Sequence, residues 1–193
     1  MKRSKKAALV LMVPVATMLL AGCGEEREQA MVFTDPSECS AAALTTASQC
    51  VADYAAAQAL HPQVAPKYLS KEECEADFGS GQCETAPQRT SSGGSVFMPM
   101  MMGYLAGQMM SRGNLQQPAA AGPSGAAGSK VATQPLYKSR DDRSTFRTAT
   151  NTPVAKGIGP ITLKPSQVKP QMGQLVQRGG FGQQAAARNS FGG

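Results

Sequence analysis

The sequence predicts a mostly α-helical protein: a small disulfide-stapled helical module, then a short apolar helix, then a largely disordered tail. Two observations lead to this prediction. Four cysteines, accompanied by two repeated helix-start signals, fall within 45 residues. After an expected export signal of 22 residues, only 24 of the remaining 171 residues are Val, Ile, Leu or Phe, about 14%, too few for a continuous apolar core along the whole chain.

Residues 1–22 have the pattern of a secretory signal peptide. Four basic residues precede an apolar run from Ala7 to Leu20, which is shorter than a membrane-spanning helix needs. The run ends in Leu20-Ala21-Gly22-Cys23, which resembles the bacterial lipobox. We therefore expect cleavage before Cys23 and acylation of this cysteine, with palmitate-like chains that bind the lipid bilayer. Gly24, in place of the aspartate of an inner-membrane retention signal, favours the periplasmic face of the outer membrane.

A linker over residues 23–30 is expected to lead into a module over residues 31–89 that contains an internal duplication. The stretch Phe33–Cys39 aligns with Tyr68–Cys74 at an offset of 35 residues, and each copy has an aromatic residue, a helix N-cap, a glutamate three positions later and a cysteine. Asp35 with Glu38, and Ser70 with Glu73, are the spacing of capping boxes, which satisfy free backbone N–H groups at helix starts. The sequence therefore predicts two short helical units.

The four cysteines of the module, Cys39, Cys50, Cys74 and Cys83, are expected to form two disulfides. An even number of cysteines in an exported protein is typical of a disulfide framework. Pairing within each unit is our preferred choice among the three possible connectivities. The spacing does not fit C-x₂₋₄-C zinc sites or C-x-x-C redox sites. A longer alanine-rich helix is expected from about residue 46 to 60, with His61 in a loop after it.

Residues 90–115 are predicted to form a Met- and Gly-rich apolar helix. Six of the eleven methionines lie between residues 96 and 110, and Gly103 and Gly107 form a small-xxx-small pair that lets helices approach closely. Three interpretations of this segment remain open: a surface that contacts the membrane or a partner, simple packing on the module, and Cu(I) coordination by the methionine thioethers. The residues expected to make the contact are Phe97, Met98, Met100, Met101, Gly103, Tyr104 and Gly107.

Residues 116–193 are expected to form a disordered basic tail rich in Pro, Gly and Ala. No period of 2 or 3.6 is sustained there, apart from a short extended piece between residues 158 and 168. Charge also divides the chain: residues 23–89 carry 11 acidic and 4 basic residues (−7), and residues 90–193 carry 2 acidic and 11 basic residues (+9). An acidic module with a basic tail is the expected arrangement.

Several short blocks stand out in order along the chain: Ala65-Pro66-Lys67-Tyr68, Cys74, Phe78-Gly79, Cys83, Met98-Pro99-Met100 to Gly103-Tyr104, and Arg178 to Gly182. Together these blocks resemble the YgiB family of uncharacterised bacterial envelope lipoproteins. Members of that family have Trp before the Met-Pro pair, where this chain has Phe97. The resemblance implies an envelope location and this architecture, and it implies no activity.

These features indicate a non-enzymatic envelope lipoprotein with a structural or interaction role. The alternative is a periplasmic-side binding protein for Cu(I) or another small ligand through the methionine cluster. We expect no catalytic residues, no metal site and no cofactor, since the one histidine lacks a serine elbow such as G-x-S-x-G nearby. Expected partners are the bilayer, through acylated Cys23, and another envelope protein or an anionic envelope polymer; nucleic acid does not fit an exported protein.

Overall fold

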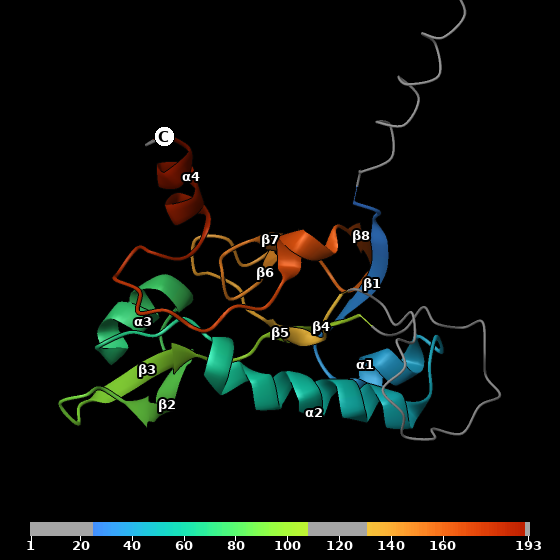
Figure 1. Cartoon of the computed structure of the whole chain (residues 1–193), viewed down its shortest axis with the longest axis horizontal. Helices are drawn as coiled ribbons and strands as arrows, with labels where there is room; N and C mark the ends of the chain where they lie inside the picture. Colours follow the sequence, from blue (N-terminus) through green and yellow to red (C-terminus); the bar gives the residue numbers. More distant parts are fainter. Residues whose placement is uncertain (1–24, 108–130, 192–193) are drawn as a thin grey trace, which may run out of the picture.

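The computed structural model describes residues 25–107 and 131–191, which form a mixed α/β structure (Figure 1). The prediction of a mostly helical protein is therefore wrong: eight strands in three antiparallel sheets accompany four α-helices in the described residues. The helices are α1 (Pro36–Ala41), α2 (Ala47–Val64), α3 (Lys71–Phe78) and α4 (Gln183–Phe191), with a short 3-10 helix η2 (Pro165–Val168). The strands are β1 (Glu28–Phe33), β2 (Cys83–Arg89), β3 (Ser95–Pro99), β4 (Gly103–Ala106), β5 (Gln134–Leu136), β6 (Phe146–Arg147), β7 (Pro153–Ala155) and β8 (Gly159–Leu163).

The largest sheet has the strand order β5-β4-β1-β8. Val32 of β1 pairs with Leu105 of β4, and both side chains are fully buried. Helix α2 packs along β4 and β5, while the β2–β3 hairpin lies at the opposite end of the long axis from β1 and β8 (Figure 1). Strand β8 lies at the sheet edge, and Pro160 is tolerated there because an edge strand has unpaired backbone positions. The extended piece expected between residues 158 and 168 is thus confirmed over residues 159–163, whereas residues 165–168 form the 3-10 helix η2.

The predicted helix starts are confirmed. The Asp35 carboxylate accepts hydrogen bonds from the backbone N–H groups of Ser37 and Glu38, and Ser70 Oγ accepts from Glu73 N at 3.2 Å. The Glu38 carboxylate reaches back to Thr34 N at 2.8 Å, one residue before the cap. Each short helix therefore begins at the residue that the repeated pattern indicates.

Both disulfides are present and both close within a unit. Cys39 is bonded to Cys50, which joins α1 to α2, and Cys74 is bonded to Cys83, which joins α3 to β2. All four sulfurs belong to buried residues. The bridges therefore connect each short helix to the next element in the chain.

The apolar helix expected over residues 90–115 is not formed in its described part, residues 90–107. Strands β3 and β4 occupy this segment, separated by Met100, Met101 and Met102. A Cβ on Gly103 would lie 2.7 Å from the Phe33 carbonyl oxygen, and one on Gly107 would lie 1.8 Å from the Val131 carbonyl oxygen. These glycines therefore let neighbouring backbone approach β4 closely. In the sequence, their spacing instead predicts a contact between helices.

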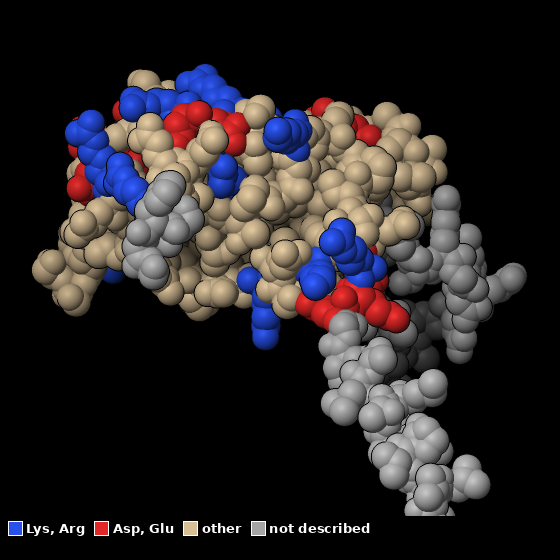
Figure 2. All heavy atoms as spheres, turned by 90° about the horizontal axis from the view of Figure 1, so that it is seen from above, with Lys and Arg blue, Asp and Glu red and all other residues tan. Residues whose placement is uncertain are grey.

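The tail expected to be disordered is ordered from residue 131 to 191. It supplies β5 to β8 and α4, and its Tyr137 and Phe146 are almost completely buried. Buried tyrosines such as Tyr137, with alanine and proline, fill a core that a count of Val, Ile, Leu and Phe underestimates. Acidic and basic side chains are interspersed on the face seen in Figure 2, because both halves of the chain fold into one body.

The first described residue is attached to the folded body. The Glu25 carboxylate accepts hydrogen bonds from the backbone N–H of Ser166, at 2.8 Å, and from its hydroxyl. Three residues later, Glu28 of β1 pairs with Leu163 of β8. Cys23 and the expected signal peptide lie outside the described residues.

Candidate functional site

A polar cluster, buried at His61 and Tyr137 and exposed at Glu84, joins α2 to β2 and to the chain after β5. His61 lies inside α2, so the expectation of a loop position is wrong, and its side chain is buried. Its Nδ1 is 2.9 Å from the Tyr137 hydroxyl, and its Nε2 is 3.1 Å from Glu84 Oε1. Because a carboxylate only accepts hydrogen bonds, neutral His61 donates from Nε2 to Glu84 and accepts from Tyr137 at Nδ1.

Burial sets the charge state of this cluster. Burial lowers the pKa of His61 below its ordinary 6.5; the Glu84 carboxylate opposes this shift, and the Lys67 ammonium adds to it. Burial also raises the pKa of the Tyr137 hydroxyl. Burial lowers the pKa of Lys67, and Glu84 again opposes the shift. At neutral pH the cluster therefore contains a neutral imidazole and a neutral phenol.

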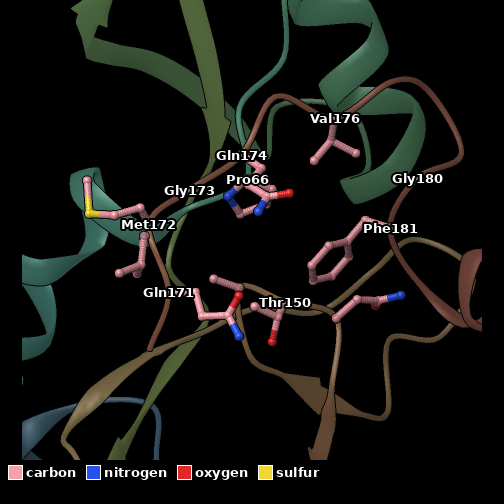
Figure 3. Close-up of a pocket in the computed structure, with 12 residues that line it drawn as sticks. Pro66, Thr150, Gln171, Met172, Gly173, Gln174, Val176, Gly180 and Phe181 are labelled. Carbon is pink, nitrogen blue, oxygen red and sulfur yellow. The ribbon is translucent and has the colours of Figure 1, made fainter. Parts of the chain in front are cut away.

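Two hollows flank the segment from Gln171 to Val176, which lies beside Lys67. The segment is held by Lys67 N donating to Gln174 O (2.9 Å) and Val176 N donating to Lys67 O (2.7 Å). The neutral hollow, about 270 Å³, is lined by uncharged side chains, including Thr150, Asn151 and Gln171. Figure 3 shows the Phe181 ring pointing into it and the Met172 thioether pointing away.

The cationic hollow, about 310 Å³, lies where the end of α2 meets the β2–β3 hairpin. Met172 and Gly173 line both hollows, so this short segment separates them. The lining of the cationic hollow includes two cations, two amides and two apolar side chains: Lys67, Arg89, Gln63, Gln88, Met172 and Leu175.

A buried carboxylate fixes the Arg178–Gly182 element that was expected to lie in a flexible tail. Asp77, at the end of α3, accepts hydrogen bonds from Gly179 N (2.6 Å), Phe181 N (3.2 Å) and the Tyr68 hydroxyl (3.0 Å). The Phe181 ring packs on Phe78 with a centroid separation of 4.7 Å. Asp77 therefore anchors the chain that closes the neutral hollow.

The predicted contact residues take different positions in the fold. Tyr104, Gly103 and Gly107 are buried around β4, and Met98 is buried in the core with Lys67 Nζ 3.6 Å from its sulfur. Phe97 and Met101 are partly buried. Met100, 44% exposed, and its neighbour Met102 line a third hollow together with Lys138 and Arg143. Two positive charges in this third hollow disfavour a Cu(I) ion there.

Both ring nitrogens of His61 are bonded to Tyr137 and Glu84, so in the described structure neither contacts a serine hydroxyl. No group of three His, Cys, Asp or Glu side chains in residues 25–107 and 131–191 is placed to hold a metal ion. In the same residues, no helix has the length and apolar character that crossing a bilayer requires.

The fold and its sites define a two-disulfide α/β module in which buried His61 and Tyr137 are hydrogen-bonded in a polar cluster with Glu84, with hollows beside it. The family described as "Protein of unknown function (DUF1190)" matches residues 27–192, and this chain belongs to it. A UPF0441 protein of Serratia proteamaculans is 30% identical over 98% of this chain and 86% of its own length. A UPF0441 protein of Sodalis glossinidius is 32% identical over the same shares. No solved structure matches this chain.

Sequence reasoning missed the polar cluster and the Asp77 anchor. His61 and Tyr137 are 76 positions apart, and Asp77 reaches residues more than 100 positions away. One local signal existed. The predicted N-cap at Ser70 starts a short helix, and Asp77 and Phe78 lie in its last turn.

Proposed function

We propose that this protein is an envelope lipoprotein of the YgiB type, anchored through acylated Cys23, whose folded part is a non-enzymatic interaction module. One observation supports it most: both disulfides are closed, so the cysteines at 39, 50, 74 and 83 are all used. Of the five cysteines in the sequence, Cys23 is the one that these two bridges do not use, and it lies at the end of the lipobox-like sequence. Stable disulfides are typical of exported proteins.

The proposal places the module at the periplasmic face of the outer membrane. Gly24 after the acylated cysteine supports this location over the inner membrane. The bilayer would then be one partner, through the acyl chains, and a second envelope protein or an anionic polymer the other. Of the predicted contact residues, Met100 is the one whose side chain is substantially exposed, so it is the first choice for contact with a partner.

Expression in a Gram-negative host, followed by membrane fractionation and intact-mass measurement, tests the proposal. We expect a chain that begins at Cys23, carries three acyl chains, shows the mass loss of two disulfides, and fractionates with the outer membrane. The matched control is Cys23→Ser, which leaves both bridges intact and should yield a chain without acyl groups. A chain that still begins at Met1, lacks acyl groups and stays in the cytosol would refute the proposal.

A further inference from the structure

The cationic hollow contains a buried ammonium, that of Lys67, which forms no ion pair at contact distance, although the Glu84 carboxylate acts on it from further away. The Lys67 side chain is buried, and its Nζ donates to the Pro62 carbonyl oxygen (2.6 Å) and lies 3.6 Å from Met98 Sδ. Both acceptors are uncharged. The ion pairs found in the described part of the chain do not include Lys67. Burial makes this ammonium costly, and no carboxylate lines the hollow itself, so an anion that reaches Lys67 from the hollow is bound favourably.

A second cation lies at the same hollow. Arg89, at the end of β2, is exposed and donates to the Gly93 carbonyl oxygen at 3.3 Å. The side-chain amides of Gln63 and Gln88 also line the space, and no acidic residue lines it. Guanidinium and amide N–H groups are donors suited to a carboxylate or phosphate oxygen. The lining therefore carries positive charge and hydrogen-bond donors.

The hollow is also lined by apolar side chains, two of which are exposed to solvent. Met172 is 71% exposed and Leu175 is 59% exposed, although Leu175 is held in place by a parallel bridge to Lys67. Exposed apolar side chains that are fixed beside cations form a surface with two chemistries. A volume of about 310 Å³ lies in the range of small-ligand sites and is too small for a folded partner.

We propose that the cationic hollow binds a small amphipathic anion: a carboxylate or phosphate group on Lys67 and Arg89, with an apolar group on Met172 and Leu175. The same chemistry occurs at a peptide C-terminus and at a lipid phosphate. The proposal does not depend on acylation of Cys23, so it can fail while the lipoprotein proposal holds, and the reverse is also true.

The third hollow provides a matched control. It also has two cations, Lys138 and Arg143, beside exposed methionines. Its lysine differs from Lys67, because Lys138 Nζ already lies 4.0 Å from the centroid of the Phe146 ring. A variant of Arg143 therefore changes the surface charge by the same amount as a variant of Arg89, at a different site.

Isothermal titration of the full mature chain, residues 23–193 with Cys23→Ser, tests the site without competition from its own acyl chains. The probes are hexyl phosphate, N-acetyl-leucine, hexanol and inorganic phosphate. We expect saturable binding of hexyl phosphate or N-acetyl-leucine, and the stronger of the two identifies the source. Arg89→Gln should weaken this binding about tenfold, the effect of losing one charge-assisted hydrogen bond, and Arg143→Gln should leave it unchanged.

Three outcomes would overturn the proposal. The first is no saturable binding of either amphipathic anion. The second is equal affinity for hexanol or for inorganic phosphate, because the hollow would then not recognise both parts of the ligand. The third is loss of affinity in Arg143→Gln but not in Arg89→Gln. Because Arg89 is exposed, its variant tests the site without the folding risk that a change at buried Lys67 carries.

Discussion

Replacing Asp77 with asparagine should detach the Arg178–Gly182 element from the fold. The Asp77 Oδ1 atom accepts from Gly179 N, while Oδ2 accepts from Phe181 N and the Tyr68 hydroxyl. Asparagine keeps one oxygen acceptor, so at least one of these bonds is lost and an N–H group faces another N–H group. Hydrogen bonds to a charged acceptor contribute about 1.5–3 kcal/mol each, so we expect a loss of about 3 kcal/mol.

Native-state hydrogen exchange measures this loss where it occurs. The amides of Gly179 and Phe181 should exchange roughly a hundredfold faster in Asp77→Asn, while amides of β1 change less, because the C-terminal element can open locally. Glu72→Gln, an exposed position of the same helix, is the control and should change neither set. Unchanged protection at both amides in Asp77→Asn would show that the carboxylate does not hold the element.

Three further predictions concern titration and the bridges. The His61 imidazole should titrate by NMR below pH 6.5, and Glu84→Gln should lower its midpoint further. As the pH falls, the unfolded chain protonates this imidazole before the folded chain does, so stability should fall as the pH drops below 6.5. Hydrogen bonds led by that from Ser144 lower the pKa of Asp142 to about 2, so its contribution should be lost as pH falls from about 4 to 2 in thermal unfolding, and Asp142→Asn should remove this dependence. Reducing both disulfides should lower the unfolding free energy by about 2.7 kcal/mol per bridge in denaturant titrations; no change on reduction would contradict their structural role.

The parts of the fold that the sequence predicted are those with local causes. A cap residue acts on backbone groups two or three positions away, so Asp35 and Ser70 marked two helix starts correctly. The cysteines of each unit are 11 and 9 positions apart, and their bridges close short loops. Features that need only neighbouring residues are visible in a single sequence.

The parts that were missed depend on distant partners. The segment at residues 95–106 is apolar enough for a helix, and it became two strands because β1 and β2 offer backbone pairing to β4 and β3. The C-terminal region is poor in Val, Ile, Leu and Phe, yet Tyr137 and Phe181 bury their rings against Phe78 of α3. Neither partner can be identified from periodicity, because tertiary pairing overrides local preference.

The hydrogen bonds between Glu25 and Ser166 have a consequence for a molecule held by Cys23. Cys23 precedes Glu25 by two positions, so the two residues can be at most about 7 Å apart along the chain. In an acylated molecule, the end of the fold that contains β1 and β8 would therefore lie close to the headgroups. The β2–β3 hairpin that bears Arg89 lies at the opposite end of the long axis, so it would point away from the bilayer that holds the anchor (Figure 1).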